Sequence, residues 1–267
     1  MKQYVKFKQT LKKYARYSSF LSPILEWYLR HKTRKESLPE LIRESERFYR
    51  ILERKKINVI LDVGAHNGIT GVTLRDRGYQ QKVISFEPLS EAFFELQTWS
   101  KLAPPWVCYN IALGDVHKWE KIKVLGNPFA SSFLNGRDLL TEELKNHGGA
   151  QVEKEELVEI KRLDDLYLSL CQESDRVLLK IDTQGYEKKV LEGSLNALRH
   201  IRLVKMELSL VEIYEGETLM HEMIAFMESL GYRPILLERG HVSEESLFQM
   251  QVDVIFTNLA FERENQT

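Results

Sequence analysis

The stretch Asn58–Gly68, with the sequence N-V-I-L-D-V-G-A-H-N-G, decides the fold of this chain. Its apolar run Val59–Leu61 is typical of a strand that is buried on both faces. Asp62 ends the run, and Gly64 and Gly68 follow in a turn that leads into a helix. A strand that ends in an acid and a glycine turn lets a ligand approach the backbone closely. The stretch therefore predicts a nucleotide-type cofactor pocket; in the structural alternative, Asp62 only caps the helix.

The spacing of the glycines distinguishes between cofactors. The dinucleotide fingerprint G-x-G-x-x-G does not occur in this turn, and an acid before the turn would repel a pyrophosphate. A second predicted strand ends in Glu87, a little over twenty residues after Asp62, where such folds place an acid that binds ribose. S-adenosylmethionine fits both positions, with its amino group near the first turn and its ribose at the second acid. In the alternative, Glu87 only ends a strand.

From residue 58 onward, predicted strands and helices alternate, which indicates a parallel sheet with crossover helices. Strands are predicted at 58–63, 82–87, 106–111, 176–182, 202–208, 232–237 and 252–257. Helices are predicted near 68–77, 90–101, 185–199 and 217–230. The alternation breaks at 114–175, where two additional strands are expected at Trp119–Leu125 and Leu157–Arg162. We expect this insertion to shape the substrate site.

The first 56 residues differ from the rest in charge. They carry 16 Lys and Arg against 6 Asp and Glu, whereas the remaining residues carry 22 against 33. Their pattern predicts three helices and no strand, the second beginning at Ser22-Pro23 and the third running from Ser37 toward Lys55. We expect a basic helical extension over 1–56 and a main domain over 57–267. The extension would either bind a membrane surface or partner, or pack on the core or on a second subunit.

The composition limits the class of protein. With 43% apolar and 29% charged residues the chain is typical of globular proteins. No stretch reaches about 18 uninterrupted apolar residues, and no signal peptide is recognisable, so we expect a cytoplasmic location, with the inner membrane face as the peripheral alternative. Cys108 and Cys171 match no metal spacing. The acidic remainder, without an aromatic-interleaved basic motif, predicts no nucleic-acid partner.

Several short motifs follow one another in a recognisable order. They are Asp62–Gly68, Phe86-Glu87-Pro88, Ala112-Leu113-Gly114, Ser131-Ser132, Leu163-Asp164-Asp165-Leu166, Leu179–Glu187, Met206–Ser209, Gly231-Tyr232 and Asp253–Phe256. Together they resemble the FkbM-type methyltransferases over about residues 58–258. The block from Lys180 to Glu187 is the specific one, whereas many class I methyltransferases share the first motif. His66 stands where the family more often has Asn.

The resemblance implies an α/β fold of the class I methyltransferase type, with a Rossmann-like, mostly parallel sheet, an antiparallel last strand and the N-terminal helical extension outside it. It also implies S-adenosylmethionine as methyl donor and an oxygen acceptor, often a sugar hydroxyl of a glycan, glycolipid or natural product. A nitrogen, carbon or small-molecule alcohol acceptor and a non-catalytic scaffold are the alternatives.

The resemblance also assigns cofactor-binding residues. Carried over by motif, they are Asp62, Gly64, Ala65, His66, Gly68, Glu87, Pro88, Asn110 and Ala112. The first turn would lie at the methionine end, Glu87 at the ribose, and Asn110–Ala112 along the adenine.

Three further side chains are candidates for the chemistry. Asp182 and Glu207 end predicted central strands, where ligands bind in open α/β sheets. Either would serve as the general base that takes a proton from the acceptor, or the two would share a divalent ion that chelates vicinal hydroxyls. The metal is not favoured, because no histidine completes a ligand set. Lys180, on the same strand face as Asp182, would lower its pKa and so favour ligand binding over proton abstraction.

Overall fold

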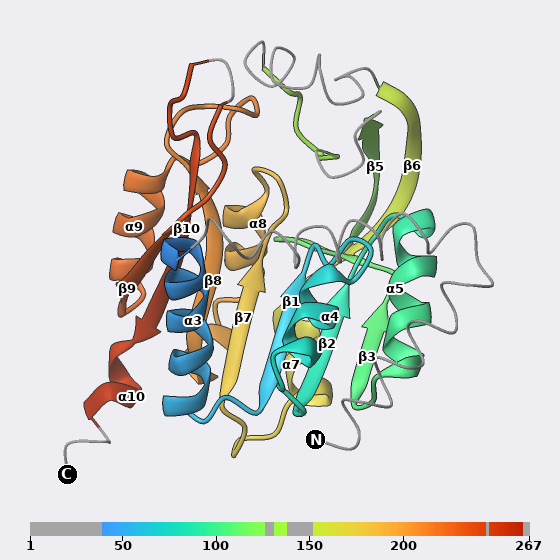
Figure 1. Cartoon of the computed structure of the whole chain (residues 1–267). Coiled ribbons are helices and arrows are strands. Elements are labelled where there is room, and N and C mark those ends of the chain that lie inside the picture. Colours follow the sequence, from blue (N-terminus) through green and yellow to red (C-terminus); the bar gives the residue numbers. More distant parts are fainter. Residues whose placement is uncertain (1–38, 126–130, 138–151, 244–245, 264–267) are drawn as a thin grey trace.

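The computed structural model describes residues 39–125, 131–137, 152–243 and 246–263. Its centre is a seven-stranded sheet with the order β3-β2-β1-β7-β8-β10-β9 (Figure 1). The strands are β1 Val59–Val63, β2 Lys82–Phe86, β3 Trp106–Tyr109, β7 Val177–Ile181, β8 Ile201–Ser209, β9 Tyr232–Arg239 and β10 Gln251–Asn258. β10 is antiparallel to both of its neighbours, and the other strand pairs are parallel. The predicted sheet, mostly parallel with an antiparallel last strand, is therefore confirmed.

Helices lie on both faces of this sheet (Figure 1). They are α3 Pro39–Arg54, α4 Ile69–Asp76, α5 Ser90–Leu102, α7 Leu163–Leu170, α8 Glu187–Glu192, α9 Met220–Ser229 and α10 Leu259–Arg263. α3 confirms the third predicted N-terminal helix, whereas the first two lie outside the described residues. Within the described residues, no helix is long and apolar enough to cross a membrane.

The alternation of side chains along the strands divides the core into two layers. Val59 and Leu61 pack into a cluster with residues of α7, α8 and α9. Ile60 packs on the opposite face, in a cluster with residues of α3, α4 and α5. Because side chains two apart on a strand share a face, Asp62 lies on the face of Ile60. This places an acid inside a layer that is otherwise apolar.

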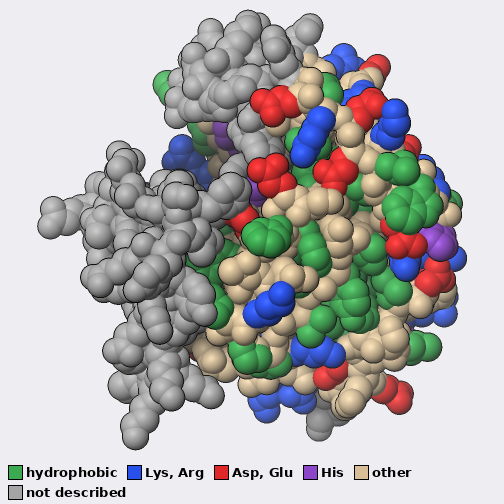
Figure 2. Space-filling model, turned by 90° about the vertical axis from the view of Figure 1, so that its right-hand side faces the viewer, with side chains coloured by type: hydrophobic (Ala, Val, Ile, Leu, Met, Phe, Trp, Pro, Cys, Tyr) green, Lys and Arg blue, Asp and Glu red, His purple; other side chains and the backbone are tan. Residues whose placement is uncertain are grey.

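A smaller sheet covers part of the insertion. It has the order β4-β6-β5, with β4 Ala112–Leu113, β5 Lys118–Leu125 and β6 Val152–Lys161. β5 confirms a predicted strand, β6 begins earlier than predicted, and β4 was not predicted. Charges of both signs lie on its surface, where Lys121 pairs with Glu155, and Figure 2 shows them intermixed in its upper part.

The helix predicted at 185–199 is wrong in one respect, because the structure divides it. α8 is followed by a short 3-10 helix, η2 Ala197–His200. Gly193 lies between them, and a β-carbon there would come within 1.8 Å of the carbonyl oxygen of Gly114. The carboxylate of Asp164 accepts hydrogen bonds from the N–H groups of Asn196 and Ala197, at 3.0 and 2.8 Å. A close backbone contact and a long-range cap thus end one helix and begin the next.

The prediction also missed α7, and it began α9 three residues too early. Asp164 and Asp165 form part of the first turn of α7, and the carboxylate of Asp164 also caps η2. Its partner lies more than thirty residues away, so local sequence does not reveal the pairing.

Candidate functional site

The turn after β1 is pressed against the end of β7. Gly64 has a φ of +72°, and a β-carbon on it would come within 1.9 Å of the carbonyl oxygen of Asp182. Gly68 has a φ of +86° and precedes α4, and His66 between them has a φ of +46°. At position 64 only glycine adopts the positive φ without strain and also leaves room for the carbonyl oxygen of Asp182. The first motif therefore holds two strand ends together.

A cavity of about 290 Å³ opens at this edge of the sheet. Its polar side comes mainly from the ends of β1, β7 and β8, and its apolar side from the ends of β2 and β3 and from the small sheet. The lining residues are Val63, Gly64, His66, Phe86, Glu87, Pro88, Leu89, Ile111, Ala112, Leu113, Ile122, Ser131, Phe133, Asp182, Thr183, Gln184, Tyr186 and Glu207. An elongated ligand with one charged and one flat apolar end would match such a lining.

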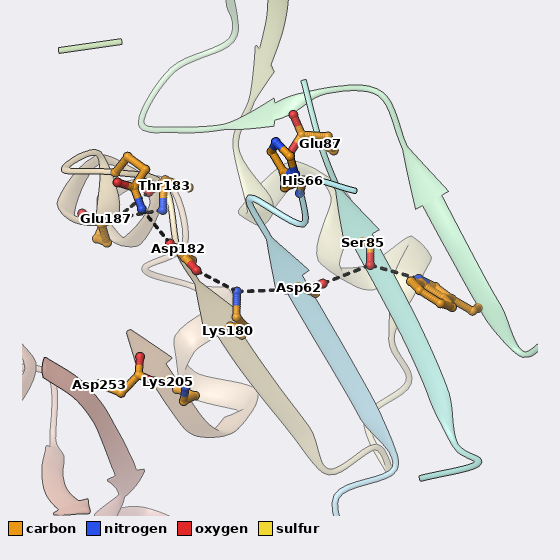
Figure 3. Close-up of polar contacts among 12 residues, drawn as sticks. Asp62, His66, Ser85, Glu87, Lys180, Asp182, Thr183, Glu187, Lys205 and Asp253 are labelled. Carbon is orange, nitrogen blue, oxygen red and sulfur yellow. Dashed lines mark hydrogen bonds and ion pairs between the residues drawn. The ribbon is translucent and has the colours of Figure 1, made fainter. Parts of the chain in front are cut away.

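Glu87 is buried at the end of β2 with its carboxylate held by backbone. One oxygen accepts the N–H of His66, which lies beside it in Figure 3, at 2.7 Å, and the other accepts the N–H of Leu89 at 2.9 Å. Burial raises the pKa of Glu87 to about 7, although both N–H groups act in the opposite direction. Two backbone donors use only half of the acceptor capacity of a carboxylate. Glu87 can therefore still accept hydrogen bonds from hydroxyl groups in the cavity.

Asn110 has a supporting position rather than a place in the lining. Its side-chain amide donates to the carbonyl oxygens of Glu87 and Pro88, both at 2.9 Å. These bonds fix the turn that carries Glu87. Of the segment Asn110–Ala112, which was predicted to lie along the adenine, Ile111 and Ala112 line the cavity.

Asp62 belongs to a row of polar side chains that crosses the sheet beneath one helical layer (Figure 3). Its carboxylate is fully buried, accepts a hydrogen bond from Ser85 Oγ at 3.3 Å, and lies 3.3 Å from Lys180 Nζ. The indole N–H of Trp106 donates to Ser85 Oγ at 3.0 Å. Asp62 does not line the cavity. The sequence predicted that this acid contacts the cofactor. In the structure, Lys180 lies between Asp62 and Asp182, which lines the cavity.

Lys180 joins the buried row to the cavity. Its ammonium lies 3.3 Å from Asp182 Oδ2 as well as from Asp62 Oδ1 (Figure 3). Burial acts to lower the pKa of Lys180, but the carboxylates of Asp182 and Asp62 outweigh it and raise that pKa. Burial acts to raise the pKa of Asp182, and the Lys180 charge reverses this, so that its pKa falls below the ordinary value. Asp182 therefore presents a carboxylate to the cavity at neutral pH, as the sequence predicted.

Glu207 has the opposite electrostatic character. Burial, followed by the negative charges of Asp182 and Asp253, raises the pKa of Glu207 to about 8. Two acids on one cavity wall thus differ in affinity for a proton, because only Asp182 has a lysine in contact. Such a divergence separates a ligand-binding carboxylate from a proton acceptor. Burial also lowers the pKa of His66, which stays neutral at pH 7.

The structure brings most of the predicted site residues together. Gly64, His66, Glu87, Pro88, Ala112, Asp182 and Glu207 line the cavity, whereas Asp62, Ala65, Gly68, Asn110 and Lys180 lie outside its lining. Sequence reasoning missed the apolar wall, above all Ile122 and Phe133 from the insertion. The ring of Phe133 lies 4.8 Å from that of Tyr186, which follows β7. The sequence signal that points to Ile122 is the alternation of Ile122 and Val124 with lysines in the predicted strand Trp119–Leu125, and the structure buries both apolar residues.

The alternative in which Asp182 and Glu207 share a divalent ion gains no support. Among the described residues, no group of three or more His, Cys, Asp or Glu side chains could hold a metal ion. The cation in contact with Asp182 is the ammonium of Lys180.

Comparison with known proteins gives the chain a family. Residues 62–234 match the family model described as methyltransferase FkbM domain, well over half of the chain. The solved FkbM methyltransferase from Methylobacillus flagellatus KT is 16% identical, with a TM-score of 0.45 over 75% of this chain and 43% of that one. Aeropyrum pernix fibrillarin, solved with natively bound S-adenosyl-L-methionine, is 10% identical, with a TM-score of 0.41 over 75% and 66%. The chain spans less than half of that FkbM structure. No curated protein matches it significantly.

Proposed function

The chain belongs to the FkbM methyltransferase family, and we propose that it transfers a methyl group to a sugar hydroxyl of a glycan, glycolipid or natural product. The family domain uses S-adenosylmethionine as cofactor. The cavity fits this group on three observations. Glu87 has acceptor capacity left for ribose hydroxyls, Gly64 leaves no side chain in the way, and an apolar wall suits an adenine ring. The polar side would hold the methionine end.

The observation that carries the acceptor class is the pair Asp182 and Glu207. S-adenosylmethionine supplies an electrophilic methyl carbon on a sulfonium. A sugar hydroxyl is a weak nucleophile, so a base that takes its proton during attack raises the rate. Glu207 suits that role because its pKa of about 8 makes it a stronger proton acceptor than an ordinary carboxylate. Asp182, held ionised by Lys180, suits the role of accepting a hydrogen bond from a neighbouring hydroxyl.

The walls of the cavity contribute by alignment. In-line displacement needs the acceptor oxygen, methyl carbon and sulfur on one line with water excluded. Phe133 and Tyr186 bring aromatic surface to the lining, and aromatic faces also pack well against sugar rings. The membrane or self-association role of the N-terminal extension stays a prediction, because most of that segment lies outside the described residues.

An acceptor screen tests the proposal. The purified full-length chain is incubated with S-adenosylmethionine and panels of nucleotide-linked sugars, glycolipids, phenols and primary amines, and S-adenosylhomocysteine release is measured. We expect release with one or more saccharides that disappears in Glu207→Gln. Release with amines or phenols alone would contradict the sugar acceptor and favour the non-sugar alternative. Failure of calorimetric S-adenosylmethionine binding by the folded protein would favour the non-catalytic scaffold.

A further inference from the structure

Gln184 has a backbone conformation that is unusual for its residue type. It lies in the turn after β7 with a φ of +54°, and Gly185 follows with a φ of +91°. Few non-glycine residues adopt this left-handed region, and those that do are concentrated at ligand sites. The turn is held there by packing, because a β-carbon on Gly185 would lie 3.1 Å from both Leu134 and Tyr214.

The strained backbone directs the Gln184 side chain between two functional groups. Its Nε2 donates to Asp182 Oδ1 at 3.1 Å, and its Oε1 accepts the hydroxyl of Tyr214 at 2.8 Å. Lys180 bonds the other oxygen of the same carboxylate at 3.3 Å. The Asp182 carboxylate is therefore held from both sides. A side-chain amide can donate to an acid through its nitrogen and accept from a phenol through its oxygen at once.

The backbone of Gln184 joins a second loop to the same point. Its carbonyl oxygen accepts the hydroxyl of Ser132 at 2.6 Å. The segment 131–137 is in turn joined to the loop of Tyr214, since Arg137 N–H donates to the carbonyl of Ile213 at 2.8 Å. Three segments that are distant in sequence thus meet at one glutamine.

We propose that Gln184 is a positioning residue: it orients the Asp182 carboxylate and links that orientation to the seating of the loops that carry Ser132 and Tyr214. The inference rests on the proposed function, in which Asp182 holds the acceptor. When both loops are seated, Gln184 is locked and Asp182 points into the cavity. Displacement of the Tyr214 loop removes the hydrogen bond to the amide oxygen of Gln184, and displacement of the Ser132 loop removes the one to its backbone carbonyl. The positions of the two loops thereby affect the orientation of Asp182 through Gln184, which itself lines the cavity.

The test follows the titration of Asp182 in the full chain by carbon-13 NMR, with Asp182→Asn for assignment. The titratable groups that interact with it are Asp62, His66, Lys180, Glu187, Lys205, Glu207 and Tyr214. Gln184→Glu keeps the shape but removes the donor and adds a negative charge, so the midpoint should rise by about 1 pH unit or more. Tyr214→Phe keeps the ring and loosens only the amide, so a smaller rise is expected. An unchanged midpoint in both variants would overturn the proposal.

Calorimetric titration of the same variants with S-adenosylmethionine separates this inference from the proposed function. We expect binding within about twofold of the parent in Tyr214→Phe, because Tyr214 lies outside the cavity lining and the change touches neither Glu87 nor Gly64. Loss of cofactor binding in Tyr214→Phe, with an unmoved Asp182 midpoint, would assign Gln184 to the cofactor site and overturn the proposal. If the parent binds no S-adenosylmethionine, the proposed function fails, while the NMR titration still decides whether Gln184 holds Asp182.

Discussion

The ammonium of Lys180 lies 3.3 Å from the fully buried carboxylate of Asp62 on the neighbouring strand. Burial raises the pKa of Asp62, and the Lys180 ammonium acts against this, because an unpaired charge in a layer of apolar side chains would lose its hydration without compensation. The pair also explains why the first motif ends its strand in an acid. That acid sets the position of Lys180, and Lys180 in turn holds Asp182 at the cavity.

Removal of Lys180 alone should therefore be severe. Lys180→Met leaves Asp62 buried without a cation, and we expect a loss of about 3–5 kcal/mol in the free energy of unfolding, measured by urea denaturation at pH 7. The double variant Lys180→Met with Asp62→Asn should recover most of this loss. Lys121→Met is the matched control, because Lys121 pairs with Glu155 on the exposed surface and should cost no more than about 1 kcal/mol. Equal losses in both lysine variants would contradict the buried pair.

Gly64→Ala should weaken cofactor binding and stability together. The added methyl group would lie 1.9 Å from the Asp182 carbonyl oxygen, so the contact between β1 and β7 must open. Gly78→Ala is the control, since Gly78 has a similarly positive φ of +93° but no atom within 4 Å. It should show only the backbone strain of about 1 kcal/mol. We expect a loss of S-adenosylmethionine affinity by calorimetry in the first variant only; an unaffected Gly64→Ala would refute the close approach.

The affinity for S-adenosylmethionine should depend on pH through Glu87. Its pKa of about 7 means that the carboxylate is partly protonated at neutral pH, and an ionised acceptor makes the stronger hydrogen bonds to hydroxyls. Binding should therefore tighten by roughly tenfold between pH 6 and 8. Glu87→Gln should bind weakly and lose most of this dependence. A parent affinity that stays constant over this range would argue against a ribose contact through Glu87.

Glu207→Gln should remove turnover while the cofactor still binds. Loss of a general base lowers rates by about 10² to 10⁴. The parent rate should rise with pH and level off above about 8, because Glu207 accepts a proton only when it is ionised. At pH 9 the variant should also be the more stable protein, since it carries no unfavourable charge at this position. A parent rate that falls between pH 7 and 8 would exclude Glu207 as the base.

The stability of the whole fold should decline as pH rises from about 4.5 to 7. Burial raises the pKa of both Glu87 and Glu187 from 4.5 to about 7. The folded chain then binds more protons than the unfolded chain in this window, so the free energy of unfolding falls with pH. Glu187→Gln keeps the acceptor for the N–H of Thr183, at 2.8 Å, and should flatten the decline. Urea unfolding midpoints at pH 5 and pH 7.5 measure this decline. An equal decline in the parent and in Glu187→Gln would contradict the role of Glu187.

The sequence predicted the parts of the site that depend on short motifs. Gly64 and Glu87 each lie in a strand-to-helix turn whose geometry is local, so their positions in the cavity could be predicted. The alternation of side chains along β1 also predicts that Asp62 is buried, because Asp62 lies on the same face as Ile60, which packs against a helical layer. That constraint was outweighed by the expectation that an acid before a glycine turn contacts a ligand.

The remaining wall of the cavity depends on pairings that no short motif encodes. Ile122 reaches the cavity only because β5 pairs with β6, and β6 with β4. Gln184 acquires its partners from segments about fifty residues before it and thirty residues after it. Such contacts are set by the packing of the complete fold rather than by local preference, which is why sequence reasoning found Asp182 but not the residue that orients it.

The neighbouring positions of β1 and β7 have a consequence for how the protein folds. Leu61 pairs with Leu179, so pairing of the two central strands closes a loop of more than a hundred residues. Closing so long a loop precedes the contacts that reward it, which makes such parallel pairings slow. The catalytic edge therefore forms late, and an incomplete chain would expose the free side of β1 as a template for association. Cofactor affinity during refolding would thus report the last step of assembly rather than the first.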